Sequence, residues 1–534
     1  MADNLSEEIR RRRTFAIISH PDAGKTTLTE KLLLYSGAID LAGSVRAKKD
    51  QRHATSDWME LERQRGISVT STVLQFDYDG HVLNLLDTPG HQDFSEDTYR
   101  TLTAADNAVM VIDAAKGIEP QTRKLFDVCK MRGIPIFTFI NKMDRPSNDP
   151  LDLLDELEKV FGISTFAMNW PLGNGSTFKG VYGRQSGEMH LYQRTEHGAT
   201  MAPVVVTTPD GPECAGLVDS RTHRQFLDEM ELLDMAGDQF DIELLRSGKL
   251  TPVYFGSAVN NFGVKLFLDS FLKFAMPPGP RPTASGQIEA DSPHFSGFVF
   301  KIQANMDPKH RDSVAFLRVC SGRFEKDMQI HHSRLGTKMR LSRPHKLFAR
   351  DRDTVEEAYP GDILGLVNPG QFAIGDSVST NGPIHFASVP KFAPEHFAVL
   401  RCPDPSNSKK FRNGLAQLTQ EGAMQVFYSA DAGSSREPII AVVGKLQFEV
   451  IQFRLQSEYG VETILDMMDG KHIRWIEGSD GDIAKISLAI GCRILEDSDE
   501  RRAVLFDGNW ALNRLIEKNP NLKFMDVAPI LGRG

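Results

Sequence analysis

The residues best suited to chemistry stand near the amino terminus, where a glycine, a lysine and a threonine follow an apolar run. Residues 15–18 predict a buried strand, and the leucines and charges of residues 27–34 predict a helix. A tight loop ending in Gly24, Lys25 and Thr26 between such elements can cradle phosphate, because loop N–H groups and the positive helix end face the anion. An ordinary strand-to-helix turn is the alternative interpretation.

Two side chains of this loop have specific uses. Lys25 can reach the β- and γ-phosphates of a nucleotide, and the Thr26 hydroxyl can ligate Mg²⁺. The first glycine of the usual phosphate-loop pattern is replaced by Ser19. The nucleotide-binding residues predicted here are Ser19, His20, Pro21, Asp22, Ala23, Gly24, Lys25, Thr26 and Thr27.

A second cluster follows a predicted hairpin, in which residues 67–76 and 81–86 are joined by an Asp-Gly turn. Ligands collect at the carboxyl ends of strands in an α/β sheet, so this loop and the first one should meet. Asp87 is then placed to hold the Mg²⁺ shell, and the Gly90 amide can reach the γ-phosphate. The predicted binding residues here are Asp87, Thr88, Pro89, Gly90 and His91.

Base selection is predicted for the loop after the strand 135–140, which reads Asn141, Lys142, Met143 and Asp144. A carboxylate only accepts hydrogen bonds, and guanine offers it two donors where adenine offers none. An unmatched buried carboxylate is costly, so Asp144 would reject ATP. The loop at Ser257 and Ala258 follows the last predicted strand, and its backbone amide can donate to the guanine O6. A surface asparagine and aspartate are the alternative.

A long polar stretch, about residues 37–66, separates the first helix from the hairpin and ends close to Ser68. A hydroxyl at this position could complete the Mg²⁺ shell only when the γ-phosphate is present, which would make the loop an order–disorder switch. Five such segments in strand-end loops and in one order are very improbable by chance. The residues therefore predict a guanine-nucleotide-binding switch.

The supporting elements divide the chain into three predicted domains. Residues 1–280 alternate strand and helix signals as a parallel α/β sheet requires, with an insertion at about 164–248. A proline-rich linker leads to short alternating strands, which predict an antiparallel β-barrel over 281–391. Residues 392–534 mix strands with two amphipathic helices and predict an α+β domain, with a looser tail after Gly478.

Composition narrows the class of protein. The net charge of −9 argues against a small DNA-binding protein, and the five cysteines are scattered, which fits a reducing cytoplasm. No apolar run approaches the roughly 18–20 residues that cross a bilayer. We expect a cytoplasmic monomer that binds neither DNA nor membrane. The run Arg10 to Arg13 is interpreted as a solvated helical lead-in.

These segments resemble the nucleotide motifs of translational GTPases, and His91 after Asp87-Thr88-Pro89-Gly90 is the distinguishing mark of that group. The general resemblance, to about Tyr459, is to elongation factor G. A more specific resemblance, to the bacterial peptide chain release factor 3 family, lies in residues 19–26, 93–102, 300–311 and 444–449. Ser68 departs from the threonine that most translational GTPases carry, and the tail from about Ile483 does not match the family pattern.

The resemblance implies a ribosome-stimulated GTPase of translation termination, which stimulates class I release factors and promotes their dissociation after peptide release. GTP would be hydrolysed to GDP and phosphate with Mg²⁺ held by Thr26, Ser68 and Asp87. Lys25 and His91 would be the catalytic residues, with His91 orienting the attacking water. The implied partners are the ribosome, with its RNA and proteins, and class I release factors. His91 could instead simply cap the helix that begins near Phe94.

Two other functions remain open at this point. One is an elongation-factor-G-like translocation or ribosome-protection GTPase, which would carry further C-terminal domains. The other is a non-catalytic binding module gated by guanine nucleotide. The basic residues Lys301, Lys309, His310 and Arg311 are consistent with either ribosomal RNA contact or a solvated barrel loop.

Overall fold

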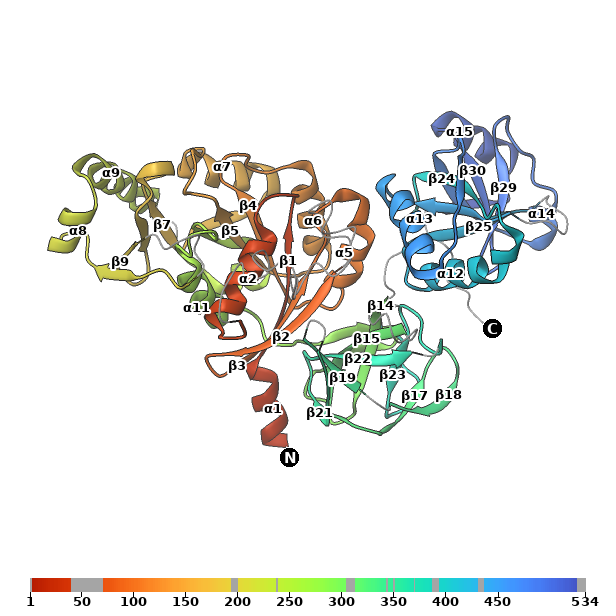
Figure 1. The fold of residues 1–534 in the computed structure, drawn as a ribbon, viewed down its shortest axis with the longest axis horizontal. Helices are drawn as coiled ribbons and strands as arrows, with labels where there is room; N and C mark the ends of the chain where they lie inside the picture. Colours follow the sequence, from red (N-terminus) through yellow and green to blue (C-terminus); the bar gives the residue numbers. More distant parts are fainter. Residues whose placement is uncertain are drawn as a thin grey trace.

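The computed structural model spans residues 1–534, and its elements group into three parts along the chain (Figure 1). The structure describes all residues except 1, 40–70, 194–199, 237–238, 304–312, 342–343, 349–350, 369, 387–392, 431–436 and 526–534. Among the described helices, none has the length and apolar character needed to cross a lipid bilayer.

A seven-stranded sheet forms the amino-terminal part, in the order β2-β3-β1-β4-β5-β11-β6. All neighbouring strands are parallel except β2, which pairs antiparallel with β3 as the predicted hairpin requires. The strands are β1 (Arg12–Ser19), β2 (Thr72–Tyr78), β3 (His81–Asp87), β4 (Asn107–Asp113), β5 (Ile136–Asn141), β6 (Ser164–Ala167) and β11 (Leu250–Phe255).

Helices cover both faces of this sheet (Figure 1). Alternate residues of β1 point to opposite faces, so Phe15 and Ile17 join a core with α2 and α11, whereas Ala16 and Ile18 join one with α6 and α7. Because helices cover both faces of the sheet, side chains that point to either face are buried, and this explains why the strands are continuous apolar runs. The helices are α1 (Ala2–Arg11), α2 (Lys25–Tyr35), η1 (Gln92–Phe94), α5 (Ser95–Leu102), α6 (Pro120–Met131), α7 (Pro150–Phe161) and α11 (Val264–Phe274).

A small antiparallel sheet, β10-β9-β8-β7, lies between β6 and β11 in the sequence. Its first strand follows β6, which itself pairs with β11 at the edge of the main sheet. The insertion expected over about 164–248 therefore begins with β6, which belongs to the main sheet, and only the strands from β7 to β10 form the separate small sheet. Its elements are β7 (Asn169–Leu172), η2 (Gly175–Thr177), β8 (Gly180–Gly183), β9 (Glu188–Tyr192), β10 (Val204–Thr207), α8 (Pro212–Leu217), α9 (Ser220–Ala236) and α10 (Ile242–Arg246).

The middle part is built on an eight-stranded antiparallel sheet, in the order β18-β17-β23-β14-β15-β22-β19-β20. Its core includes Val299, Leu317 and Leu364. The strands of this part are β12 (Arg281–Thr283), β13 (Gly286–Ile288), β14 (Ser296–Gln303), β15 (Ser313–Ser321), β16 (Phe324–Glu325), β17 (Gln329–His332), β18 (Thr337–Arg340), β19 (Pro344–Phe348), β20 (Asp351–Thr354), β21 (Glu357–Ala358), β22 (Ile363–Asn368) and β23 (Ser377–Ser379).

A second eight-stranded sheet forms the carboxyl-terminal part, in the order β27-β24-β26-β25-β29-β30-β28-β31. The elements are β24 (His396–Arg401), η4 (Pro405–Asn407), α12 (Ser408–Gln420), β25 (Gln425–Ser429), β26 (Ile439–Val442), α13 (Leu446–Tyr459), β27 (Ile464–Met467), β28 (His472–Glu477), α14 (Asp480–Ala484), β29 (Arg493–Asp497), β30 (Arg502–Phe506), α15 (Asn509–Lys518) and β31 (Lys523–Met525).

The expectation of a looser tail after Gly478 is wrong. β29 and β30 pair with each other and insert between β25 and β28, so residues beyond 478 complete the sheet. Val504 and Phe506 pack with Leu515 of α15 in a separate small core. The strand signal is weak because each strand is only five residues long and β29 has charged residues at both of its ends.

The interpretation of Arg10 to Arg13 as a solvated lead-in is wrong for the last two arginines. Arg12 and Arg13 begin β1 and are buried. Arg12 Nε lies 2.9 Å from Asp362 Oδ2, and Thr14 Oγ1 donates to the Gly361 carbonyl at 2.7 Å. Arg12 and Thr14 therefore bind the first strand of the amino-terminal sheet to residues 361 and 362 of the middle part.

Candidate nucleotide-binding site

The phosphate loop lies between the end of β1 at Ser19 and the start of α2 at Lys25. Gly24 has a left-handed backbone, with φ of 97°, and caps the helix. A Cβ at Gly24 would lie 2.3 Å from Asn141 Nδ2, so only glycine fits both the conformation and the space. The N–H groups at the start of α2 are thus presented at the loop, as anion binding requires.

Lys25 and Asp87 meet at the centre of the site, although 62 residues separate them. Lys25 Nζ lies 2.5 Å from Asp87 Oδ1, and both side chains are buried. Asp87 is the last residue of β3, and Thr88 fixes the turn that follows by donating to the Ile17 carbonyl at 2.7 Å. The predicted meeting of the first two loops is therefore present.

Gly90 brings the second loop against the first. A Cβ at Gly90 would lie 3.5 Å from the backbone of Pro21, which is ordinary van der Waals contact. Thr26 and Thr27 stand in the first turn of α2 beside these residues. Ser19 is buried, and its Oγ has no hydrogen-bond partner among the described residues, which leaves a polar atom in the cradle for a ligand.

Asn141 joins three loops. Its Nδ2 donates to the Ala23 carbonyl at 2.8 Å, and its Oδ1 accepts from the amides of Lys142 at 2.8 Å and Ala258 at 2.9 Å. Met143 is buried beneath these contacts, and its amide donates to the Gly256 carbonyl at 3.1 Å. This asparagine therefore braces the loops rather than projecting toward a base.

Lys142 crosses the phosphate loop. Its ammonium donates to the Asp22 carbonyl and to Asp113 Oδ2, the latter at 2.8 Å. Burial acts to raise the pKa of Asp113, but the hydrogen bonds from Lys142 and from the Ala115 amide, together with the charge of Lys142, outweigh it and lower that pKa. Sequence reasoning missed Asp113, although its place at the end of β4 is the same signal that identified Asp87.

Asp144 is held by the last predicted loop. Its Oδ1 accepts from Ser257 Oγ at 2.6 Å, and Asn260 Nδ2 also donates to this hydroxyl, at 3.0 Å. Ser257 and Ala258 are buried, whereas Asp144 is half-buried. Among the described residues the second carboxylate oxygen has no hydrogen bond of its own and can accept from a ligand.

His91 turns toward its own downstream turn. Its Nδ1 accepts from the Asp93 amide at 3.2 Å, and its ring centroid lies 6.0 Å from that of Phe94. The capping interpretation is partly met, because the hydrogen bond closes η1 just before α5 begins at Ser95. The ring is 31% exposed, which leaves it accessible to other partners.

His20 has a partner that sequence reasoning missed. It is buried in the phosphate loop, and its Nε2 lies 2.7 Å from Glu119 Oε2 at the start of α6. Burial lowers the pKa of His20, and the charge of Glu119 opposes that effect. Neutral imidazole is therefore favoured beside the phosphate loop.

The remaining predicted residues are Ser68 and the basic residues at 301 and 309–311. Ser68 lies outside the described residues, as do Lys309, His310 and Arg311. Lys301 is described, and both interpretations offered for it are wrong because it is buried. Its ammonium donates to the Ser71 carbonyl at 2.5 Å instead of facing solvent or RNA.

Family comparisons agree with this arrangement along the chain. Residues 10–277 match the elongation factor Tu GTP binding domain, and residues 294–381 match elongation factor G domain 2. Residues 386–516 match the class II release factor RF3, C-terminal domain. The expected series of GTPase domain, β-barrel domain and α+β domain is confirmed, and the match reaches well past Ile483.

Individual relatives match over nearly the whole chain. Peptide chain release factor 3 of Gloeobacter violaceus is 60% identical and covers 98% of this chain and 99% of its own length. The same-named protein of Nostoc punctiforme is 55% identical, with coverage of 99% and 98%. A crystal structure from Thermus thermophilus shares the fold, with a TM-score of 0.68, 24% identity and coverage of 88% of this chain and 71% of that one. The chain therefore belongs to the peptide chain release factor 3 family and is a guanine-nucleotide-binding GTPase of translation termination.

Proposed function

We propose that this GTPase works on the ribosome after the nascent peptide has been released, and that GTP hydrolysis promotes departure of the class I release factor. The observation that carries this proposal is the combination, in one chain, of four converging nucleotide loops with a C-terminal domain of the release factor type. The alternative function is translocation of the elongation factor G type or ribosome protection, and measurement of release-factor dissociation distinguishes it from the proposed function.

The nucleotide would lie across the loops in a defined orientation. Lys25 would bind the β- and γ-phosphates, together with the amides of residues 19–27. Asp144 would accept hydrogen bonds from guanine, supported by Ser257. Ala258 would line the O6 side of the base, with another amide of its loop as the donor, because its own amide donates to Asn141 Oδ1. Asn141 would keep the phosphate and base loops at a fixed separation. Residues 87–91 would cover the γ-phosphate.

Mg²⁺ fits the donor set that the residues provide. Thr26 supplies a hydroxyl and Asp87 a buried carboxylate next to Lys25, and Mg²⁺ prefers such oxygen ligands together with water and phosphate. Ser68 is proposed as the further ligand. When bound, the ion would offset charge on the phosphates during phosphoryl transfer.

Catalysis would be mostly positioning and charge neutralisation. His91 would orient the attacking water, and Lys25 would stabilise charge on the γ-phosphate. Because the sequence places no arginine as an evident internal finger, the chain alone should hydrolyse GTP slowly. The ribosome would order His91 and supply the remaining stabilisation.

The same proposal includes the organisation and setting of the chain. The domains are residues 1–280, 281–391 and 392–534, and the family matches fall within or nearly within these bounds. We place the protein in the cytoplasm, because ribosomes and class I release factors are its proposed partners, and we propose that it is a monomer in solution.

The test is GTP turnover with and without bacterial ribosomes, measured beside dissociation of a labelled class I release factor from post-termination complexes. Ribosomes should raise turnover by at least about tenfold, and GTP should accelerate dissociation of the factor. Unchanged turnover would refute the ribosomal role. Stimulated turnover without faster dissociation, but with movement of tRNA and mRNA, would favour translocation.

A further inference from the structure

Asp93 stands two residues beyond His91, and its role is not part of the nucleotide motifs. It lies in η1 and is nearly buried. Its amide donates to His91 Nδ1 at 3.2 Å, and its Oδ1 lies 3.4 Å from the same nitrogen. The Asp93 amide therefore holds the ring of His91, whereas Asp93 Oδ1 only lies beside Nδ1, because both of these atoms are hydrogen-bond acceptors.

The other oxygen of Asp93 contacts a different part of the chain. Asp93 Oδ2 accepts from the amide of Leu446 at 2.8 Å, across 353 residues of sequence. Leu446 is the first residue of α13, whose opening N–H groups have no partner within the helix. A carboxylate is favoured there by the hydrogen bond and by the positive end of the helix. Asp93 thus holds the ring of His91 through its amide and binds the C-terminal domain through its carboxylate.

The fit around Asp93 is tight. A Cβ at Gly444 would lie 2.1 Å from Asp93 Cγ, 2.4 Å from Cβ and 2.5 Å from Cα. Such distances leave no room for any larger residue at 444 while the two domains are in contact. The C-terminal domain is therefore seated directly on η1.

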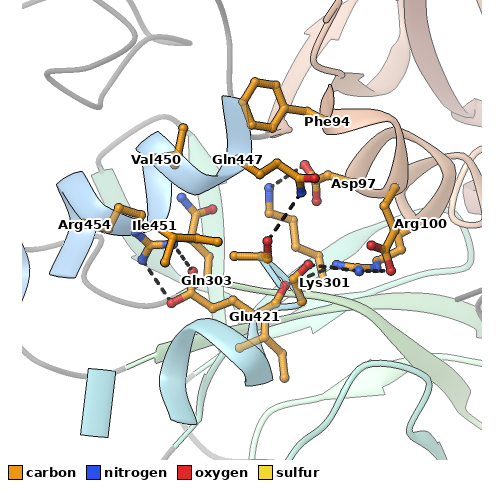
Figure 2. A pocket seen from close by; sticks show the side chains of 14 residues that line it. Phe94, Asp97, Arg100, Lys301, Gln303, Glu421, Gln447, Val450, Ile451 and Arg454 are labelled. Atoms are coloured by element: carbon orange, nitrogen blue, oxygen red, sulfur yellow. Dashed lines mark hydrogen bonds and ion pairs between the residues drawn. The ribbon is translucent and has the colours of Figure 1, made fainter. Parts of the chain in front are cut away.

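Further hydrogen bonds join the amino-terminal part to the C-terminal domain beside this contact. Arg100 of α5 donates to the carbonyls of Glu421 at 3.3 Å and Gly422 at 3.1 Å, next to α12. Figure 2 shows Arg100, Lys301 and Glu421 gathered around one pocket, with Arg454 of α13 on its other side. Three parts of the chain meet here, so the position of α13 is fixed relative to η1.

His91 contacts η1, the segment on which the C-terminal domain packs. Within the described part of the chain, its hydrogen bonds and ring contacts are with Asp93 and Phe94, and none is with Lys25 or the phosphate loop. The side chain proposed to act at the γ-phosphate is thus engaged by η1 while η1 is engaged by α13.

We propose that Asp93 is a positioning residue through which the seated C-terminal domain restrains His91, so that release of this domain frees the ring for hydrolysis. The inference rests on the role proposed for His91. Seating of α13 keeps Asp93 fixed, and Asp93 keeps His91 turned toward η1. Separation of the domains removes the Leu446 contact and lets η1 and His91 move.

The test uses Gly444→Ala, which forces α13 away from Asp93 without altering the nucleotide loops. The matched control is Gly508→Ala, in the same domain, where φ is 175° and a Cβ would meet nothing within 4 Å. GTP turnover without ribosomes should rise at least about threefold in kcat for Gly444→Ala, with KM nearly unchanged. Gly508→Ala should match the parent.

Coupling through His91 is tested by repeating Gly444→Ala in a His91→Ala background. The rise should disappear there, because non-additivity is the signature of residues that act on one another. Asp93→Ala should also raise turnover, whereas Asp93→Asn keeps an acceptor for the Leu446 amide and should remain near the parent. This pair keeps the test valid if Gly444→Ala does not fold.

Equal turnover for Gly444→Ala, Asp93→Ala and Gly508→Ala would overturn the inference, as would a rise that persists without His91. Failure of the proposed function is distinguishable. If His91→Ala retains full ribosome-stimulated turnover, the catalytic role of His91 is wrong. If His91→Ala loses it but Gly444→Ala has no effect, only the restraint by the C-terminal domain is wrong.

Discussion

Asp144 is the residue that we propose determines which nucleotide the site accepts. Its carboxylate is held by Ser257 through one oxygen and is half-buried, so the other oxygen can accept from a base. Sequence reasoning identified both residues, because a carboxylate at a strand end and a small residue after the last strand are visible as types and positions. It did not identify His20 with Glu119, since nothing in either local sequence indicates the contact.

The residue-scale prediction is that Asp144→Asn shifts preference from GTP toward xanthosine triphosphate. Asparagine presents a donor where guanine also presents donors, so GTP affinity should fall by about 10–100-fold. Xanthine carries a carbonyl in place of the 2-amino group and should bind better than before. Competition binding with both nucleotides measures this.

The control for Asp144→Asn is Asp155→Asn, an exposed carboxylate on α7 that pairs only with Lys159 among the described residues. It should leave the selectivity unchanged. Unaltered GTP selectivity in Asp144→Asn itself would contradict the base-reading role.

At the scale of elements, the sheet and its helices were largely predictable. Apolar runs gave the buried strands, and the Asp79-Gly80 turn predicted the hairpin of β2 and β3. β29 and β30 are not evident from the sequence, because each is only five residues long, β29 has charged residues at both ends, and the strands β25 and β28 that flank them come earlier in the sequence. Non-local pairing of short strands leaves little local signal.

The element-scale prediction concerns the turn from β1 into α2. Gly24→Ala should abolish detectable GTP binding, because alanine is strained at φ of 97° and its Cβ would lie 2.3 Å from Asn141 Nδ2. Displacing Asn141 would also release Ala23 and Ala258. Titration with a fluorescent GDP analogue measures the loss.

Gly133→Ala is the matched control for Gly24→Ala. Gly133 also has a left-handed backbone, with φ of 64°, but a Cβ there would meet nothing within 4 Å. It carries the backbone strain alone, so it should keep nucleotide binding with only a modest loss of stability. Equal loss of binding in both variants would mean that strain, rather than the Asn141 contact, explains the effect.

The arrangement of the whole molecule was beyond sequence reasoning. A charged side chain in isolation is usually solvated, so the sequence predicts an exposed position for Arg12 and an exposed or RNA-binding position for Lys301. Both are buried between domains, where Arg12 pairs with Asp362 and Lys301 lies 3.5 Å from Asp97. Such partners are 200 or more residues away, so only the folded molecule reveals why the charges are there.

Lys301 fixes the strand that follows the long polar loop. Its ammonium donates to the Ser71 carbonyl, and Asp97 Oδ2 accepts from the Ser71 amide and hydroxyl, both at 2.6 Å. Burial acts to raise the pKa of Asp97, but Lys301 and Ser71 outweigh it and lower that pKa. Asp97 is therefore ionised, and its contribution to stability is lost only as pH falls through this lowered pKa.

The prediction at this scale is that Lys301→Met lowers the urea midpoint and speeds hydrogen exchange in β2. Removing Lys301 leaves the half-buried Asp97 without this cation, and because breaking a fully buried pair costs about 3 kcal/mol, the loss here should be smaller but measurable. Lys326→Met is the control, since Lys326 pairs with Glu356 at 2.8 Å on the exposed surface and should shift neither measurement. If Lys301→Met behaves like Lys326→Met, Ser71 is held by Asp97 alone, and the middle domain does not control the strand after the loop.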